Sequence, residues 1–580
     1  MRIENITAVY FCWHLDGEDE QQELMAIHSE TDECSTYDVT WMAPAHPGLV
    51  WYYFAIHNQD GSMYYGNNQD GYGGVGIEIT GKPPKYQITV YQDVYLPPAW
   101  FQGKVIYQIL VDRFYNGHTD NQILHAKKNS VIHSHWENDP LYIRGENGDI
   151  LRWDFYGGNL LGVIKKLAYL SELGVDIIYL NPVFQAPSNH KYDTGDYHKI
   201  DEMFGNEEIF QKLCDEAKKY GISIILDGVF SHTGSDSKYF NKQGSYDSIG
   251  AYQSKDSPYF SWYRFHQHPE DYESWWGIDV MPNVNELDSS YQSFIIDAKD
   301  SVINYWQRFG IIGWRLDVAD ELPDQFIKRM KRQLRTNNPD SVLIGEVWED
   351  ASNKISYSER REYLLGDELD SVTNYLLRDM IIRFILGHID AGEVHLKMNS
   401  MLENYPTEHF NSLMNIVGTH DTPRILSLVN QDVDDDTALK RVQLISIWQL
   451  LLPGNPCIYY GDEAGLTGIE EPLNRRTYPW GNENSQLLNW YRNILKIKKK
   501  YNVFQTGDFE SFHILEDLYG FKRSTQSVQT LVLINRSDQE KNIKLEDWHT
   551  EDTVMLVGNK DAFHDGITIP AFEAVVLIKQ

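Results

Sequence analysis

The chain has 580 residues with an ordinary globular balance, 42% hydrophobic and 23% charged. Its 84 acidic and 51 basic side chains give a formal net charge of −33 at pH 7. A surface this acidic repels phosphate backbones and anionic lipids, so we expect no nucleic acid partner, no membrane partner and a neutral substrate. The four cysteines include no C-x-x-C pair, which predicts neither a disulfide framework nor a zinc site.

The N-terminal residues carry no long apolar segment of the kind that forms a signal peptide. No run along the chain approaches the roughly 20 apolar residues of a membrane-spanning helix. The sequence as given therefore predicts a cytoplasmic protein.

Short aromatic or β-branched runs separated by turn residues fill residues 1–100, as at 51–56 and 86–90. This spacing predicts a small N-terminal β-sandwich. Its aromatic side chains either form the core of that sandwich or bind sugar, and the core is the simpler interpretation. Pro97-Pro98 then predicts a stiff connection into the next domain.

From Val105 onward, short apolar strands alternate with helical segments, a pattern that predicts a parallel sheet. Helical spacing is clearest over residues 160–173 and 207–220. The expected strands are 105–111, 175–180, 222–226, 310–316, 342–344, 370–375, 413–417 and 457–460. Eight such strands favour a closed (β/α)8 TIM barrel over an open sheet, and we assign this barrel to residues 101–500.

One connection inside the barrel is too long for this pattern. After the third strand, residues 232–287 form an insert rich in Tyr, Trp, Ser and Gly, and such inserts usually carry function. Its runs at 259–263 and 275–276 offer aromatic rings that stack on sugars. Residues 501–580 return to short strands and predict a C-terminal β-sandwich.

Polar residues recur where the barrel strands end, which is the face that holds the active site in this fold. A lone arginine two residues before an aspartate is most simply a structural ion pair, because alternate residues of a strand share a face. Four such strand ends directed at one mouth instead indicate function. The residues are Asp227 and His232 at the third strand, Arg315 and Asp317 at the fourth, Glu346 at the fifth, and His420 and Asp421 at the seventh.

Three carboxylates with histidines and an arginine, and without metal-ligand spacing, point to glycoside hydrolysis. That reaction uses one carboxylate as nucleophile and another as general acid. We expect Arg315 to lower the pKa of Asp317 and keep it ionised. We expect desolvation beside Trp348 to raise the pKa of Glu346, which suits an acid that later acts as a base.

These residues resemble the α-amylase family of retaining glycoside hydrolases. The matching motifs are 227–232, 313–321, 345–348 and 418–421, and the resemblance covers essentially the whole chain. Within the family, the chain is most similar to the neopullulanase, cyclomaltodextrinase and maltogenic amylase branch, through residues 281–285 and 318–321.

The resemblance implies that Asp317 is the nucleophile, Glu346 the acid/base and Asp421 the transition-state stabiliser. It implies a retaining hydrolase of α-1,4 and also α-1,6 glucosidic bonds in cyclomaltodextrins, pullulan or maltodextrins, with transglycosylation as a side reaction. The substrate contacts that it implies are Tyr192, Asp227, His232, Arg315, Trp348, His420 and Arg424. From the sequence alone, Tyr192 is either a stacking platform or a residue of loop packing.

Two departures from the branch pattern lie near the acceptor side. The usual M-P-K-L-N has Asn283 and Val284 in its third and fourth positions, and the usual V-A-N-E has Asp320 in place of Asn. They bear on linkage preference and transglycosylation, not on the hydrolytic residues.

The resemblance implies no cofactor for the chemistry, but some members hold a structural calcium ion. The matching residues are Asn116, Asp120, Asn121 and Gly157, while two expected acids are replaced by His118 and Asn159. Calcium prefers carboxylate and carbonyl oxygens. The resemblance also implies a homodimer formed through the N-terminal domain.

The alternative functions are an α-glucanotransferase or an α-glucosidase of the same family. A non-catalytic relative, such as an amylase-like transporter subunit, needs a membrane span and can lose its carboxylates. This sequence has no such span and keeps all three acids, which also argues against a role in carbohydrate binding alone.

Overall fold

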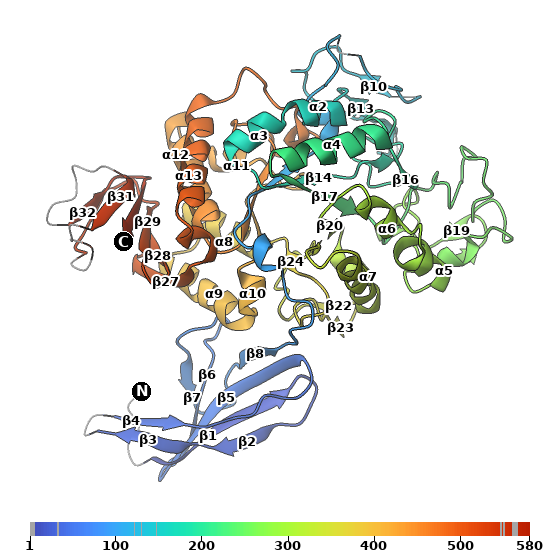
Figure 1. Cartoon of the computed structure of the whole chain (residues 1–580). Helices are drawn as coiled ribbons and strands as arrows, with labels where there is room; N and C mark the ends of the chain where they lie inside the picture. Colours follow the sequence, from blue (N-terminus) through green and yellow to red (C-terminus); the bar gives the residue numbers. More distant parts are fainter. Residues whose placement is uncertain are drawn as a thin grey trace.

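A parallel sheet of eight strands forms the centre of the molecule (Figure 1). The computed structural model describes residues 6–31, 34–120, 122–128, 130–146, 148–545, 548, 552–558 and 566–580. In chain order the strands are β9 (Ile106–Ile109), β14 (Ile177–Leu180), β17 (Ser223–Gly228), β20 (Gly313–Leu316), β21 (Val342–Gly345), β24 (Ser371–Val372), β25 (Met414–Ile416) and β26 (Asn455–Tyr459). All eight strands predicted for the barrel are therefore present.

The sheet closes on itself. Its hydrogen-bonded order is β24-β21-β20-β17-β14-β9-β26-β25, and a parallel bridge between Thr373 and Met414 joins the two ends. The predicted (β/α)8 barrel is confirmed. Because all strands run in parallel, their carboxyl ends meet at one mouth.

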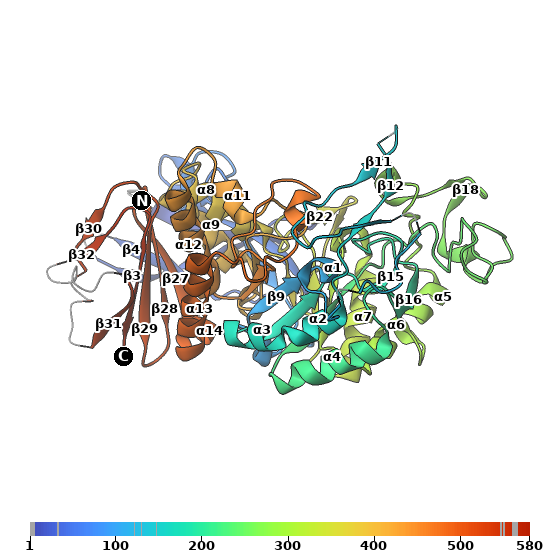
Figure 2. The same cartoon turned by 90° about the horizontal axis from the view of Figure 1, so that it is seen from above.

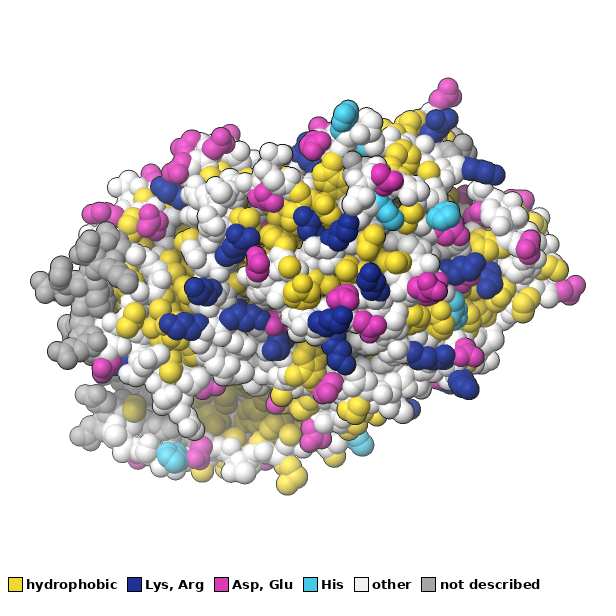
Figure 3. All heavy atoms as spheres, turned by 45° about the horizontal axis from the view of Figure 1, so that its top comes forward, with side chains coloured by type: hydrophobic (Ala, Val, Ile, Leu, Met, Phe, Trp, Pro, Cys, Tyr) yellow, Lys and Arg dark blue, Asp and Glu magenta, His cyan; other side chains and the backbone are white. Residues whose placement is uncertain are grey.

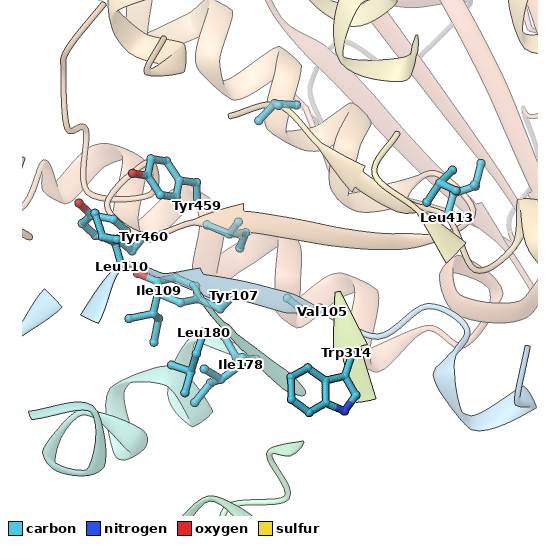
Figure 4. Packing of buried hydrophobic residues seen from close by; sticks show 14 of the residues in the cluster. Val105, Tyr107, Ile109, Leu110, Ile178, Leu180, Trp314, Leu413, Tyr459 and Tyr460 are labelled. Atoms are coloured by element: carbon cyan, nitrogen blue, oxygen red, sulfur yellow. The ribbon is translucent and has the colours of Figure 1, made fainter. Parts of the chain in front are cut away.

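Alternation along each strand divides the core into two layers. Ile106, Ile177, Ile225 and Ile344 belong to one buried cluster, which fills the barrel interior. Their neighbours in sequence belong to a larger cluster that packs under the surrounding helices. Figure 4 shows part of this outer layer, with side chains from β9, β14, β20 and β26.

Helices cover the outside of the barrel. The longer ones are α4 (Glu207–Lys219), α7 (Asp324–Asn337), α8 (Tyr375–Ile385), α9 (Ala391–Asn404), α12 (Asp435–Leu451) and α13 (Ser485–Lys500). The shorter ones are α1 (Val111–Phe114), α2 (Leu160–Lys165), α3 (Leu167–Leu173), α5 (Ser289–Gln292), α6 (Val302–Gln307), α10 (Thr407–Phe410), α11 (Ile425–Val429) and α14 (Val503–Thr506). The single helix predicted over 160–173 is two helices, because the backbone of Lys166 leaves the helical region at φ −103°, ψ 4°.

Antiparallel sheets lie at both ends of the chain, as predicted (Figures 1 and 2). The N-terminal sheets contain β1 (Ile6–Leu15), β2 (Gln21–Leu24), β3 (Ala26–Glu30), β4 (Ser35–Asp38), β5 (Gly48–Asn58), β6 (Gly61–Gly66), β7 (Ile77–Ile79) and β8 (Tyr86–Val90). The C-terminal sheets contain β27 (Asp508–Leu515), β28 (Leu518–Ser524), β29 (Gln529–Asn535), β30 (Lys541–Ile543), β31 (Thr553–Val557), β32 (Ile567–Ile569) and β33 (Ala574–Lys579). The C-terminal sheet packs against α9, where His395 is within hydrogen-bond distance of Ser511.

Short two-stranded sheets, one of them parallel and the others antiparallel, lie at the barrel mouth. They are β10 (Val131–Ile132) with β13 (Asp154–Phe155), β11 (Ile143–Arg144) with β12 (Ile150–Arg152), β15 (Phe184–Gln185) with β16 (Asp196–Ile200), β18 (Phe265–Gln267) with β19 (Asp271–Tyr272), and β22 (Ile355–Ser356) with β23 (Glu359–Arg360). The β18–β19 pair lies in the insert after β17, and the β22–β23 hairpin follows β21. These loops therefore build the walls above the strand ends.

On the face shown in Figure 3, lysines and arginines are interspersed with acidic and apolar side chains. Among the described residues, no helix has both the length and the apolar character needed to cross a bilayer.

Candidate active site

A pocket of about 710 Å³ opens at the carboxyl ends of the barrel strands. This volume is in the range of small-molecule sites. One wall comes from the loops after β17, β20 and β21, including Trp276, Glu321 and Tyr357. The opposite wall comes from the loops after β14, β25 and β26, including His190 and Arg475.

Arg315 binds three carboxylates beneath the pocket floor. Its Nη1 donates to Asp227 and to Asp317, each at 2.9 Å, and its Nη2 lies 2.7 Å from an oxygen of Glu346. The strand period explains this convergence, because Asp227 and Glu346 follow the inward-facing Ile225 and Ile344 by two positions, and Asp317 follows Arg315 itself by two. The structure thus brings the acids predicted at three strand ends onto one guanidinium.

The chain turns sharply directly after Asp317. Val318 adopts φ 36°, a conformation that is rare for a β-branched residue. Its N–H donates to Glu346 at 2.9 Å. Strain of this kind persists where the surrounding structure holds it and is typical of functional sites.

Burial dominates the protonation of this cluster. It raises the pKa of Asp317 well above its ordinary value, and the neighbouring charge of Glu346 adds to this while Arg315 opposes it. Arg315 lowers the pKa of Asp317, as predicted, but burial outweighs this effect because one arginine serves three buried carboxylates, so the net shift is upward. Burial also raises the pKa of Glu346, as predicted, and we expect Asp317 and Glu346 to titrate as a pair that retains a proton.

A hydrogen-bond chain runs across the opposite wall. The Tyr192 hydroxyl donates to Asp227 at 3.0 Å and lies 2.6 Å from His420 Nε2, and the two rings are parallel at 5.3 Å. Gln108 Nε2 lies 2.9 Å from His420 Nδ1. Because Gln108 donates there, the proton of a neutral His420 is on Nε2. Burial lowers the pKa of His420 well below its ordinary value, which is consistent with the neutral form.

Asp421 lies at the rim of the same wall. Its Oδ1 accepts from Arg475 Nη2 at 3.2 Å, and its Oδ2 lies 3.0 Å from His420 Nε2. Arg475 also donates to the backbone oxygen of His420 at 2.9 Å, so it fixes both residues. Asp421 lines the same pocket as Asp317 and Glu346.

Two other predicted contacts are at the pocket. His232 lines it, and burial lowers the pKa of this histidine to about 4. Trp348 is 45% exposed, stacks on Tyr375 at 3.8 Å and donates to Glu346 at 3.3 Å. Both positions are compatible with contact to a ligand.

Arg424, in contrast, is not among the residues that line the pocket. It is fully buried, pairs with Asp462 at 3.0 Å and donates to the Asn474 backbone oxygen. Asn474 in turn donates to the backbone oxygen of His420. Arg424 therefore supports the loop from behind, which corrects the prediction that it contacts substrate.

Some aromatic residues of the insert after β17 are buried within it, and others line the pocket. Trp262 and Tyr263 are buried inside the insert itself, so the run 259–263 serves packing instead of sugar stacking at these positions. Trp275 and Trp276 line the pocket. Backbone bridges from His232 to Asn283 and from Tyr263 to Val284 hold the motif 281–285 along this wall.

The aspartate that departs from the branch pattern has an ion-pair partner. Asp320 lies 3.1 Å from Lys354 Nζ and accepts from the Tyr363 hydroxyl at 2.6 Å. Lys354 stands directly before the β22–β23 hairpin. Asp320 therefore anchors this hairpin.

Three residues of the site were not predicted from the sequence motifs: Gln108, Arg475 and Tyr357. Gln108 is a polar residue in an apolar strand, and its period-two relation to Ile106 places it inside the barrel. This pattern could have predicted that Gln108 points into the barrel. Arg475 and Tyr357 lie in loops whose course the pattern does not fix.

In the loop that matches the family's calcium site, the oxygens expected to bind calcium accept hydrogen bonds from other groups of the chain. Asn116 Oδ1 and the Gly157 backbone oxygen each accept from the Asn159 side-chain amide at 3.1 Å. The Lys165 ammonium donates to the Gly117 backbone oxygen. Asp120 accepts from the Gln122 backbone N–H, and Asn121 lies outside the described residues. An amide and an ammonium among the expected ligand oxygens do not fit a calcium ion.

We therefore expect the melting temperature of the purified protein to change by less than about 1 °C between excess EDTA and excess calcium, because a ligand stabilises only a state that binds it. Lys165→Ala should lower the melting temperature, since the Gly117 oxygen loses its donor, while the exposed Lys218→Ala on α4 serves as control. Calorimetry checks this. A rise of several degrees on adding calcium to the EDTA-treated protein would contradict it.

A closed (β/α)8 barrel that gathers three carboxylates around one arginine at its strand ends defines a glycosidase of the barrel class. Residues 108–505 match the family model described as the catalytic domain of alpha amylase. This chain belongs to the α-amylase family of glycoside hydrolases, as its motifs predicted.

The relatives support the predicted branch, and they also include an amylopullulanase, which the motifs did not predict. The chain is 38% identical to an amylopullulanase of Thermoanaerobacterium saccharolyticum across 92% of its length, but it spans only 46% of that protein. It is 32% identical to a cyclomaltodextrinase of Geobacillus thermopakistaniensis, covering 78% of this chain and 72% of the relative.

A solved structure agrees with the family. A cyclic α-maltosyl-(1→6)-maltose hydrolase from Arthrobacter globiformis superposes with a TM-score of 0.70 at 26% identity, covering 83% of this chain and all of the other, 100%.

Proposed function

We propose that this chain hydrolyses α-glucosidic bonds with retention of configuration, with Asp317 as nucleophile and Glu346 as acid/base. The observation that carries this is the placement of both carboxylates on the two terminal nitrogens of one guanidinium, at 2.9 and 2.7 Å. Carboxylates held in this way lie close together. This fits the separation of about 5 Å used for retention better than the roughly 6.5–9.5 Å used for inversion.

The reaction proceeds in two displacements. Glu346 gives its proton to the glycosidic oxygen while an oxygen of Asp317 attacks the anomeric carbon, which releases the leaving sugar and forms a covalent glucosyl ester. Glu346, now ionised, takes a proton from water as the water oxygen attacks the same carbon. Asp317 leaves as a carboxylate, and Glu346 regains its proton.

The opposite wall provides the site for the sugar that becomes attached. The Tyr192 ring is a platform beside His420, and neutral His420 and the carboxyl group of Asp421 present a donor and an acceptor to sugar hydroxyls. We assign to Asp421 the stabilisation of the transition state. Arg475 contributes by orienting it at 3.2 Å.

For substrates we infer cyclomaltodextrins, pullulan or short maltodextrins, with cleavage of α-1,4 and also α-1,6 bonds. The names of the relatives, an amylopullulanase and a cyclomaltodextrinase, support this. A net charge of −33 suits a neutral glucan. The homodimer implied by the resemblance stays a prediction, for which exposed Leu24, Ile27 and Met42 offer apolar surface on the N-terminal part.

The first product released from β-cyclodextrin or maltoheptaose should be the α-anomer, because two inversions restore the starting configuration. Proton NMR in the first minutes, before mutarotation, measures it. Initial β-product would contradict retention. Product analysis on pullulan, β-cyclodextrin and soluble starch side by side then separates α-1,4 from α-1,6 cleavage.

A further inference from the structure

Two aromatic side chains stand exposed at the pocket mouth and share one carboxylate. Trp276 is 75% exposed and Tyr357 is 72% exposed, and both line the pocket. Trp276 Nε1 donates to Glu321 Oε1 at 3.1 Å, and the Tyr357 hydroxyl donates to Glu321 Oε2 at 2.7 Å. Three loops, after β17, β20 and β21, therefore meet at Glu321.

The backbone is strained at both aromatic residues. Trp276 has φ 50° and Tyr357 has φ 51°, and Ser358 next to it has φ 68°. Non-glycine residues adopt this region only where other contacts hold them. Exposed rings gain little from burial, so this strain argues for a use of the rings instead of a packing role.

Both rings have further support. Trp276 stacks on Trp275 at 5.2 Å with an interplanar angle of 17°. Tyr357 is at the tip of the β22–β23 hairpin, which Asp320 anchors through Lys354 at 3.1 Å. Asp320 and Glu321 are consecutive, so one short segment after Asp317 holds both the base and the tip of this hairpin.

The wall of the pocket on which Trp276 and Tyr357 lie indicates which sugar units of the substrate they contact. The proposed acid Glu346 must lie next to the leaving-group oxygen, and Trp348 and Tyr357 come from the same loop as Glu346. His190, His420 and Arg475 stand on the opposite wall with Tyr192. The wall that contains Glu321 therefore faces the sugars on the leaving side of the cleaved bond.

We propose that Glu321 is a positioning residue that holds Trp276 and Tyr357 as a two-ring binding site for the glucose units on the leaving-group side. This deepens the proposed function and rests on it. Aromatic rings bind the apolar faces of pyranose units, and the exposed faces of these two rings suit an α-linked glucan. Both oxygens of Glu321 already accept hydrogen bonds, so it acts through the rings.

The test compares a substrate that occupies these positions with one that does not. Maltoheptaose places glucose units on the leaving side, whereas p-nitrophenyl α-maltoside places only the nitrophenyl group there when p-nitrophenol is released. Tyr357→Ala should raise KM for maltoheptaose about 5- to 10-fold, the loss expected for one aromatic contact. It should leave kcat/KM for p-nitrophenol release within about twofold, since the catalytic acids keep their places.

Variants of Glu321 separate positioning from contact. Glu321→Ala should reproduce the effect of Tyr357→Ala although both rings remain, and Glu321→Gln, which keeps one acceptor oxygen, should restore part of the affinity. Tyr357→Phe should fall between the wild type and Tyr357→Ala. Tyr220→Ala, an exposed tyrosine at the end of α4, is the matched control and should change neither substrate.

Unchanged KM for maltoheptaose in Tyr357→Ala and Glu321→Ala would overturn the inference. An equal loss on both substrates would also overturn it, because that result indicates damage to the site as a whole. Failure of the proposed function looks different, since p-nitrophenol release would then survive the loss of Asp317.

Discussion

Asp317→Asn should lower kcat on maltoheptaose and on p-nitrophenyl α-maltoside by at least about three orders of magnitude, because the amide cannot form the glucosyl ester. The side chain keeps its size, so its hydrogen-bond distance to Arg315, 2.9 Å in the wild type, can be preserved. KM, where turnover is still measurable, should change far less than kcat. Initial rates on both substrates are the measurement.

The same variant should be at least as stable as the wild type. Burial raises the pKa of Asp317 in the folded protein, so folding disfavours its charged form. The stability that Asp317 contributes is fully present below its unfolded pKa, about 3.9, and is lost as the pH rises through the raised folded value. At neutral pH the asparagine removes this loss, and calorimetry should show a melting temperature no lower than that of the wild type.

An exposed aspartate provides the matched control. Asp300 pairs with Arg308 on the surface, and Asp300→Asn should leave turnover unchanged. Ordinary turnover in Asp317→Asn would contradict its role as nucleophile. A lost activity accompanied by a much lower melting temperature would instead indicate a structural role.

The barrel could be predicted because its strands are buried on both faces. Runs such as 224–226 and 342–344 are short and continuously apolar, and a carboxylate follows each within two residues, at Asp227 and Glu346. The period of two then explains why Arg315 and Asp317 share a face while Trp314 packs outside. The ends of the strands and the residues that point into the barrel could therefore be predicted without knowing how the sheet closes.

The protonation of the site could not be predicted in the same way. Two residues apart, Arg315 and Asp317 suggest a simple pair, but the guanidinium also binds Asp227 and Glu346 from neighbouring strands. Whether one arginine contacts carboxylates from several strands depends on the order of the strands in the barrel. The local sequence does not reveal that order. The pKa of a buried acid depends on the number of partners and on lost solvation, so the pair alone predicted the effect of Arg315 but not the net direction of the shift.

Nearness in sequence was misleading for Arg424. It follows Asp421 by three positions, yet the chain turns inward and the side chain pairs with Asp462. Arg475, more than fifty residues later, reaches Asp421 instead. The walls of the pocket come from loops, and their contacts are set by packing that has no sequence period.

Glu346→Gln should lower kcat on maltoheptaose by about 10²- to 10⁴-fold, the usual contribution of general acid–base catalysis. The loss should be much smaller for the first bond cleavage in p-nitrophenyl α-maltoside, because p-nitrophenolate leaves without a proton. Hydrolysis of the glucosyl ester still needs a base, so a burst of p-nitrophenol should precede a slow steady state. Stopped-flow absorbance measures both phases.

Azide distinguishes this chemistry from a damaged site. An anionic nucleophile needs no base, so azide should restore steady-state turnover of the aryl substrate in Glu346→Gln and give an α-glycosyl azide, since it attacks the same face as water. Asp317→Asn should gain no such α-azide, because it forms no glucosyl ester. Failure of azide to restore turnover would contradict the role of Glu346.

The pH dependence should follow the same group. An acid works only while protonated, and burial raises the pKa of Glu346 above its ordinary value, so the wild type should lose kcat/KM on maltoheptaose as the pH rises through that raised pKa. In Glu346→Gln with the aryl substrate and azide, this alkaline decline should disappear, because no proton is delivered to the leaving group. A decline that persists unchanged would assign the titrating proton to another residue.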